Sequence, residues 1–268
     1  MTTATRDVET AVLDEAAARE RLGRHGAAYL PVPPDARRHI VIAIVAAVGA
    51  FAAALGFTFG ATVLGIVGLT VAVVCGVRGL AGWGWSGLIT ARNSGTRLDL
   101  YEQGLVLTYR GRVRVIRYDT TRVRRKILQL TKNPGPGQIS YTYTVTDVTG
   151  VPVVLRHGFE RPQQWGPAIE RAVTEAQLPG MSAALDAGAR LDFDRFWLTR
   201  DEIGAGRDAV SWSRVEELEV IGGWLSVQVV GRSQPLESLP VSLIPNYPIF
   251  RALVDRMRMS RQEIVNEA

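Results

Sequence analysis

Residues Ile40–Gly82 read IVIAIVAAVGAFAAALGFTFGATVLGIVGLTVAVVCGVRGLAG, and the only charged side chain among them is that of Arg78. A membrane-spanning helix needs about 20 apolar residues, because each residue rises about 1.5 Å through a hydrocarbon core of about 30 Å. These 43 residues are therefore too many for one span and suit two spans joined by a tight turn. We predict spans over 40–57 and 62–82, with the turn at residues 58–61.

Basic and aromatic residues flank this predicted hairpin at one face of the membrane. Arg37 and Arg38 precede the first span, Arg78 lies near the end of the second, and Trp83 and Trp85 follow it, whereas the turn carries no charge. Basic flanks favour the cytoplasmic side, and tryptophan favours the membrane interface. An arginine near a span end can extend its side chain to the interface. The sequence predicts a cell-membrane protein (inner or plasma membrane) with both termini in the cytoplasm, in which the hairpin is an anchor.

The charges outside the hairpin are unevenly distributed. Residues 1–39 carry six Arg and six acidic side chains, net zero, and we expect them to form a mobile cytoplasmic arm. Residues 83–180 carry 14 basic and 7 acidic side chains, net +7, whereas residues 181–268 carry 10 and 13, net −3. This asymmetry predicts that the first soluble unit meets an anionic surface and that the second does not.

Short strand patterns separated by turn residues follow the hairpin. In the first unit we predict strands over 96–100, 105–109, 112–118, 123–130, 139–148 and 151–156, a loop at Asn133–Gly137, and a helix over 162–177 that stops at Pro179. In the second we predict strands over 190–193, 217–221, 224–230 and 236–239, then a closing helix after Asn246.

The two soluble units read as an internal repeat. Arg97-Leu98-Asp99-Leu100 returns as Arg190-Leu191-Asp192-Phe193 at a spacing of 93 residues. The predicted fold is a membrane α-hairpin followed by two α+β units, over residues 90–179 and 186–260. Each is expected to be a bent antiparallel sheet of about seven strands capped by a C-terminal helix.

Short motifs connect this pattern to a known arrangement. They are Tyr101-Glu102-x-Gly104-Leu105 in the first unit and Trp212-x-x-Val215, Gly223-x-Leu225 and Ile244-Pro245-Asn246 in the second. Over roughly residues 30–260 the chain resembles an uncharacterised bacterial family, known only as a domain of unknown function, with a membrane hairpin and two tandem pleckstrin-homology-like domains. The resemblance implies a fold, an anchor and a binding or scaffolding role, and it brings no catalytic residues.

The run from Arg110 to Lys126 holds eight basic residues and one acidic residue. Alternate residues of a strand share a face, and like charges that face each other across a sheet are destabilising. If the strands at 112–118 and 123–130 lie in one curved sheet, six cations crowd one surface and need a counter-anion, which anionic inner-leaflet lipid can supply. The predicted lipid-binding or anion-binding residues are Arg110, Arg112, Arg114, Arg117, Arg122, Arg124, Arg125 and Lys126. The alternative is a solvated sheet face.

Signals for catalysis are weak. The chain has no Gly-Lys-Ser phosphate loop and no Gly-x-Ser-x-Gly nucleophile motif. Its single Cys and three scattered His give no metal-ligand spacing. Asp192 and Asp194 could form a carboxylate pair but more often such residues are solvated, and Glu216, Glu217 and Glu219 look like an acidic rim. We expect no enzyme activity, cofactor, metal or nucleic-acid partner.

The leading hypothesis is a membrane-anchored, non-enzymatic binding or scaffold protein. Its basic unit would lie on anionic phospholipid, and its acidic unit would dock an unidentified protein partner. One alternative is a structural homo-oligomer assembled through the Gly-rich hairpins, since Gly56-x-x-x-Gly60 matches a helix-packing motif. Another is an accessory subunit of a membrane enzyme complex.

Overall fold

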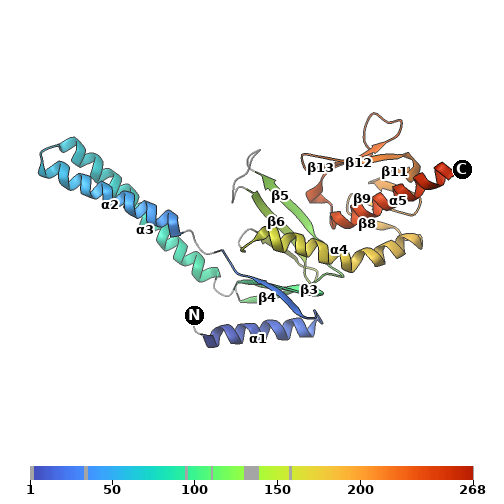
Figure 1. Cartoon of the computed structure of the whole chain (residues 1–268), viewed down its shortest axis with the longest axis horizontal. Coiled ribbons are helices and arrows are strands. Elements are labelled where there is room, and N and C mark those ends of the chain that lie inside the picture. Colours follow the sequence, from blue (N-terminus) through green and yellow to red (C-terminus); the bar gives the residue numbers. More distant parts are fainter. Residues whose placement is uncertain are drawn as a thin grey trace. The chain divides into compact units, whose positions relative to one another are not determined.

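The computed structural model describes residues 3–32, 36–93, 96–109, 111–129, 139–156 and 159–267, and Figure 1 shows their helices and strands. The chain forms two compact units. One consists of residues 1–30, 97–108 and 112–268, and the other of residues 31–96 and 109–111. The predicted loop at Asn133–Gly137 lies outside the described residues.

The helical hairpin closely follows the sequence prediction. Helices α2 (Ala36–Thr58) and α3 (Thr62–Asn93) are joined by residues 59–61, where Gly60 adopts a positive φ of 73° that favours glycine. Over Ile40–Thr58 and Thr62–Gly79 the helices are long and apolar enough to cross a membrane, and most of their large apolar side chains are exposed. The second helix was predicted to end near residue 82 but continues to Asn93, because no proline interrupts it.

Glycines bring the two helices of the hairpin close together. A Cβ atom on Gly68 would lie 2.5 Å from the backbone nitrogen of Ala53 and 2.7 Å from the carbonyl oxygen of Gly49. A Cβ atom on Gly56 would lie 2.3 Å from the backbone nitrogen of Gly65. Only glycine permits such an approach. These glycines therefore serve packing within the hairpin of one chain, and packing between hairpins of different copies stays a prediction.

The residues before the hairpin belong to a folded unit. Helix α1 (Thr3–Arg19) is followed by β1 (His25–Tyr29), which pairs antiparallel with β2 (Arg97–Tyr101) on the far side of the hairpin in the sequence. Leu13, Ala17 and Leu22 are buried in a cluster with Tyr101 and Val106 of the sheet. The expectation of a mobile arm is therefore wrong over these residues, because ladder hydrogen bonds and apolar contacts hold them in place.

A hydrogen bond to a buried carboxylate also holds β1. The Nε2 atom of His25 lies 2.8 Å from Oδ1 of Asp99, whose side chain is fully buried. Arg97 donates to the same oxygen from Nη2 at 2.7 Å. The strand HGAAY has few residues with high strand propensity, so these contacts across the sheet account for its position.

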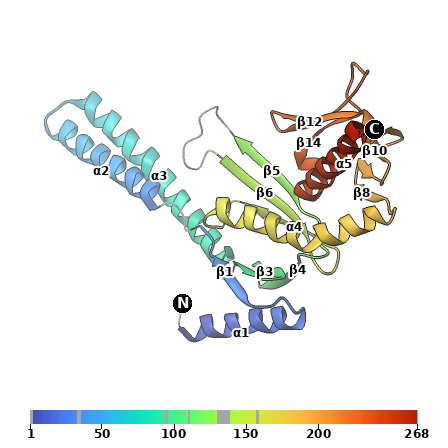
Figure 2. The same ribbon diagram turned by 45° about the vertical axis from the view of Figure 1, so that its right-hand side comes forward.

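Two sheets and a helix make up what we call the first module, β1–β7 with α4. One sheet has the order β1-β2-β3-β4, with β3 at Gly104–Tyr109 and β4 at Arg112–Arg117. The other has the order β5-β6-β7, with strands at Arg124–Gln129, Ile139–Thr146 and Pro152–Arg156. Helix α4 (Pro162–Asp186) runs alongside β5 and β6 in Figures 1 and 2. The strands predicted for this module are confirmed to within about two residues.

The same order recurs in the second module, β8–β14 with α5. Its four-stranded sheet has the order β11-β10-β9-β8, with strands at Leu191–Phe193, Phe196–Leu198, Glu202–Ala205 and Asp208–Ser211 for β8 to β11. The short helix η1 (Trp212–Arg214) leads to the sheet β12-β13-β14, with strands at Val215–Ile221, Trp224–Val229 and Ser238–Pro240. The short helix η2 (Val241–Leu243) and α5 (Tyr247–Glu267) complete it. Strands β9 to β11 were not predicted, because segments this short show little alternation.

The sequence repeat and the structural repeat agree only in part. The Arg97-to-Leu100 motif lies in the second strand of the first module, whereas Arg190-to-Phe193 leads into the first strand of the second. Both motifs make the same local contact, because Arg97 pairs with Asp99 and Arg190 with Asp192. The fifth strand of the first module, β5, and the fifth strand of the second, β12, do correspond at the spacing of 93 residues.

Helix α4 passes the proline that was expected to stop it. Pro179 lies inside the helix, which continues to Asp186. Trp165, Ile169 and Val173 are buried before the proline and Leu185 after it, so packing on both sides outweighs the lost backbone hydrogen bond. The predicted boundary between two soluble units at 179–186 thus falls within a helix, and a single cluster of buried side chains includes residues of both modules.

Asn246 joins the two modules through buried hydrogen bonds. Its Oδ1 accepts from the backbone N–H of Val123 at 2.7 Å, and its own N–H donates to the carbonyl of Val123 at 2.8 Å. Its Nδ2 donates to Oε1 of Gln177 on α4 at 2.9 Å. Asn246 has a positive φ of 48°, a conformation that asparagine tolerates better than most residues.

Candidate functional site

Carboxylates of the same chain neutralise most of the predicted basic surface. Arg114 pairs with Asp147 at 2.9 Å, Arg117 with Asp119 at 2.7 Å and Arg125 with Glu170 at 3.0 Å. Arg122 and Arg124 both pair with Asp194 of the second module. The counter-anion that the sequence pattern requires is thus largely supplied from within the protein.

The expected crowding of six cations on one surface is also wrong. Strand β4, which carries Arg112 and Arg114, belongs to the sheet β1–β4, whereas β5, which carries Arg124 and Lys126, belongs to the sheet β5–β7. Arg110 lies outside the described residues. Among the described members of the predicted set, Arg112 and Lys126 are exposed and have no carboxylate partner.

Lys126 gains a neighbour that sequence reasoning missed. The register of the sheet places Lys126 opposite Thr142 and Thr142 opposite Arg156, so the three residues form one row across β5, β6 and β7. Adjacent strands are about 4.8 Å apart, so the two cations flank the threonine at roughly 10 Å from each other. Within the described part of the chain, Arg156 has no carboxylate partner and is exposed.

We call this surface the cationic face, the side of the sheet β5–β7 that points away from α4. Alternation along the strands places Arg124 and Leu128 on it beside Lys126, since Arg125 turns to Glu170 on α4. Ser140, Thr144 and Val154 complete it by register. Its residues are Arg124, Lys126, Leu128, Ser140, Thr142, Thr144, Val154 and Arg156. Arg124 is paired with Asp194, so Lys126 and Arg156 are the two cations that this face, with its hydroxyl groups, offers to a negatively charged partner.

The opposite side of this sheet is part of the core. Burial raises the pKa of the Glu170 carboxyl, and the nearby Arg125 guanidinium opposes that shift only in part. Tyr143 lies beneath α4 and contacts the ring of Trp165 edge to face. Arg125 therefore pairs with Glu170 on the α4 side of the sheet, opposite the cationic face.

Asp147 holds the turn between β6 and β7. Burial opposes ionisation of its carboxyl, but hydrogen bonds from Thr149, Val151 and Arg114 outweigh that effect and lower its pKa. The Oδ1 atom accepts from the N–H groups of Thr149 and Val151, each at 2.9 Å. Arg114 thus stabilises a turn.

The corresponding face of the second module carries the opposite charge. Its register places Glu219 opposite Ser226 and Ser226 opposite Ser238, with Glu217 opposite Gln228 in the next row. The row at the other end joins Ile221, Trp224 and Pro240. We call this surface the acidic face, with the residues Glu217, Glu219, Ile221, Trp224, Ser226, Gln228, Ser238 and Pro240. The predicted acidic rim thus continues into an exposed apolar end.

The other predicted acidic candidates do not form a site. Asp192 pairs with Arg190, and Asp194 lies in the β8–β9 turn with a positive φ of 62°, where it pairs with Arg122 and Arg124. Within the part of the chain that the structure describes, no three His, Cys, Asp or Glu side chains form a group that could hold a metal ion.

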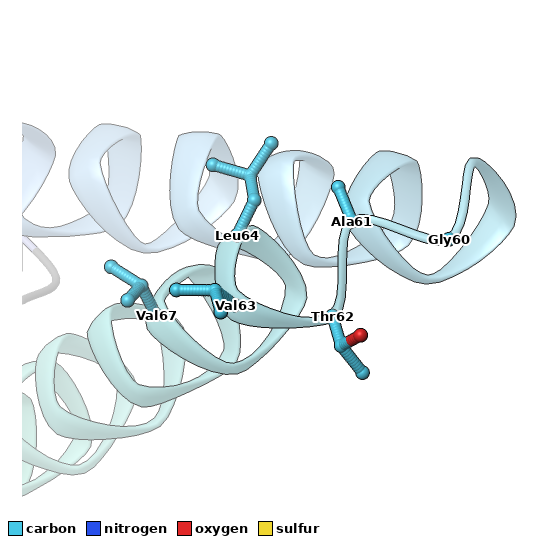
Figure 3. Close-up of a pocket in the computed structure, with 6 residues that line it drawn as sticks. All are labelled: Gly60, Ala61, Thr62, Val63, Leu64 and Val67. Carbon is cyan, nitrogen blue, oxygen red and sulfur yellow. The ribbon is translucent and has the colours of Figure 1, made fainter.

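The predicted membrane-interface residues all lie in the hairpin helices. Arg37 and Arg38 are in the first turn of α2, and Arg78, Trp83 and Trp85 are in α3. The side chain of Arg78 is exposed. A hollow at the hairpin turn is lined by Gly60, Ala61, Thr62, Val63, Leu64 and Val67 (Figure 3). Its only side-chain polar group is one hydroxyl, so it offers no chemistry.

Comparison with known proteins identifies the family. The family of unknown function DUF6585 matches residues 1–263. The chain belongs to this family. The expected membership of an uncharacterised family is thus confirmed, and the DUF6585 match also covers α1 and β1, which precede most of the segment on which the resemblance was based. No curated protein and no solved structure matches the chain.

Proposed function

We propose that this DUF6585 protein is a membrane-anchored, non-enzymatic binding or scaffold protein. The observation that carries the proposal is the hairpin of α2 and α3, whose apolar side chains face outward along lengths sufficient to cross a membrane. The exposed fractions of Phe51 and Val63 are 68% and 78%, which water would disfavour and lipid would favour. The basic flanks at Arg37, Arg38 and Arg78 favour a cytoplasmic location for both termini in the cell membrane.

We assign a pleckstrin-homology-like fold to each soluble module. The support is the shared order of four antiparallel strands, three antiparallel strands and one helix, found in β1–β7 with α4 and again in β8–β14 with α5. In the first module the anchor is inserted in sequence between the first strand and the second. Two binding modules attached to one anchor suit a scaffold, with the acidic face available to a protein partner.

The cationic face is the part of the first module that we propose to contact anionic phospholipid. Lys126 and Arg156 have no carboxylate partner among the described residues, and Thr142 between them can donate a hydrogen bond to a phosphate oxygen. A basic residue close to an anionic leaflet contributes about 1 kcal/mol to the free energy of membrane binding. The contact is thus weak by itself and orients a module that the hairpin already attaches to the membrane.

Lysine labelling tests the lipid contact directly. The chain has only two lysines, Lys126 and Lys132, so Lys132→Arg leaves Lys126 as the single reactive side-chain amine. We expect an amine-specific acetylating reagent to modify Lys126 several-fold more slowly in phosphatidylglycerol nanodiscs than in phosphatidylcholine nanodiscs, with the difference lost at high salt.

Charge reversals provide the controls. Arg156→Glu should abolish the protection of Lys126, whereas Arg200→Glu, at an exposed arginine of the second module, should leave it unchanged. Equal labelling rates in both lipids would rule out the lipid contact. Failure of the protein to float with vesicles would rule out the anchor itself.

A further inference from the structure

We propose that the acidic face of the second module docks the cationic face of the first module of another copy of this protein. The inference goes beyond lipid contact and rests on the proposed anchor, which confines the copies to one membrane. One cationic face holds either anionic lipid or another copy, so docking is tested below in phosphatidylcholine, which supplies no anionic competitor. It gives the acidic face a definite partner and makes the protein a self-assembling scaffold.

Strand β12 concentrates carboxylates that the protein leaves unpaired. In contrast to this strand, Asp208 and Glu237 of the second module each pair with an arginine, at 2.8 and 2.7 Å, and Asp186 at the end of α4 pairs with Arg256 of α5 at 3.0 Å. Neither Glu217 nor Glu219 has a basic partner among the described residues. The only side-chain hydrogen bond described for either is from the amide of Gln228 to Glu219 at 3.2 Å. The negative charge of this face is therefore available to an external cation.

The apolar end of the acidic face also lacks cover. The exposed fractions of Ile221 and Trp224 are 67% and 53%, and they face each other across the turn at Gly222–Gly223. A Cβ atom on either glycine would meet no atom within 4 Å, so the turn projects into open space. Exposed tryptophan beside polar groups is typical of the centre of a protein interface.

The fifth strand of the first module carries the complementary pattern at the same positions. Arg124, Lys126 and Leu128 alternate along β5. The residues 93 positions later, on β12, are Glu217, Glu219 and Ile221. Both faces therefore have two rows of charge or hydrogen-bonding groups and one apolar end. Opposite signs disfavour pairing of like faces and favour pairing of unlike faces.

Sheet geometry indicates which residues meet. When two three-stranded sheets lie face to face with their apolar ends together, the order of strands in one is reversed relative to the other. Strand β7 then lies over β12, and β5 lies over β14. In this arrangement Arg156 is opposite Glu219, Thr142 is opposite Ser226, Lys126 is opposite Ser238, and Leu128 lies near Trp224 and Pro240. The ion pair of the contact is thus the one between Arg156 and Glu219, and Glu217 lies over Val154 at its edge.

The size of the contact explains why it needs a membrane. Three strands about 4.8 Å apart and three rows about 6.6 Å apart give a face of roughly 15 by 15 Å. The total area buried on both partners is then about 450 Å², below the roughly 1,200 Å² of stable interfaces. Confinement of the copies by their anchors raises their effective concentration and favours such a weak contact.

Cross-linking between two tagged forms of the full chain tests the proposal. Both forms carry Cys75→Ala; one also has Arg156→Cys and the other Glu219→Cys, and they are reconstituted together in phosphatidylcholine vesicles. A short bismaleimide should link the two forms several-fold more than it links Arg156→Cys to Ser233→Cys, a control at an exposed loop residue. Equal linking of both pairs overturns the proposal.

Charge exchange supplies the second arm. The reference is fluorescence transfer between labelled copies that keep both Arg156 and Glu219. Transfer should fall below this reference when all copies carry Arg156→Glu, and also when all copies carry Glu219→Arg. Mixing the Arg156→Glu form with the Glu219→Arg form should restore transfer, which a folding defect could not do. Failure of rescue overturns the proposal, while flotation of the vesicles and Lys126 labelling report separately on the anchor and on lipid contact.

Discussion

Val123 and Asn246 exchange two hydrogen bonds across 123 positions of the sequence, one from each backbone N–H. The first leads into β5 and the second precedes α5, so this pair joins the start of one sheet to the closing helix of the other module. Asn246 belongs to the Ile244-Pro245-Asn246 motif. Its position shows that the motif helps to hold the two modules together.

Asn246→Ala should lower the free energy of unfolding by about 3 kcal/mol, because it leaves the N–H of Val123 without its acceptor and places alanine at a positive φ. Urea denaturation of the detergent-solubilised protein measures the change. Asn246→Gly also removes the acceptor but introduces no strain at the positive φ, so its free energy of unfolding should fall by less than that of Asn246→Ala. Equal stability of the wild-type protein and Asn246→Ala would show that the two hydrogen bonds between Val123 and Asn246 do not stabilise the fold.

Replacing residues 31–96 with a short flexible linker should give a folded, monomeric soluble unit. The strand partners Tyr29 and Leu98 lie about 5 Å apart across the ladder, so a few residues can bridge them. A chain that begins at Thr96 lacks α1 and β1 and exposes Tyr101 and Val106, so we expect it to aggregate. Gel filtration and circular dichroism compare the two, and a soluble, equally stable short chain would show that β1 is dispensable.

Asp147→Asn should destabilise the first module by about 2 kcal/mol at pH 7, since the charged carboxylate accepts several hydrogen bonds. The pKa of Asp147 is lowered in the folded state, so its contribution is present above the unfolded pKa of about 3.9 and is lost as the pH falls through the folded value. The difference between the two proteins should therefore shrink below about pH 4. Asp119→Asn removes an exposed ion pair and should have little effect.

Gly68→Ala should destabilise the hairpin by roughly 1–3 kcal/mol, as is usual when extra atoms enter a well-packed contact. The added Cβ would meet backbone atoms of α2, which cannot move aside as a flexible side chain can. Gly76→Ala is the matched control, because its Cβ would meet nothing within 4 Å. Thermal unfolding in detergent should show a lower midpoint temperature for Gly68→Ala and an unchanged one for Gly76→Ala.

Local pattern was sufficient for much of the fold. The helix bounds at the hairpin turn follow from hydropathy and Gly60, and the strands of the first module follow from alternation and turn residues. In α4, the buried side chains of Trp165, Ile169 and Val173, which precede Pro179, have helical spacing. In each case the deciding signal lies within a few residues of the element.

The features that were missed depend on contacts distant in sequence. β1 is fixed by pairing with β2 and by the His25–Asp99 contact, about 70 residues away. The neutralisation of Arg122 and Arg124 depends on Asp194 of the second module, and Arg156 joins Lys126 only through the register of three strands. Charge counting within one segment could not reveal either relationship.

The position of β1 before the hairpin also has a consequence for synthesis. The ribosome makes β1 first and β2 only after both hairpin helices, so the sheet β1–β4 cannot close until the whole anchor has emerged. Closing a flexible loop of the 67 residues from Leu30 to Thr96 costs about 4 kcal/mol in chain entropy, on a logarithmic length dependence. A hairpin that has already formed shortens the effective loop and removes much of this cost. The sheet β1–β4 therefore forms only after synthesis of the hairpin is complete.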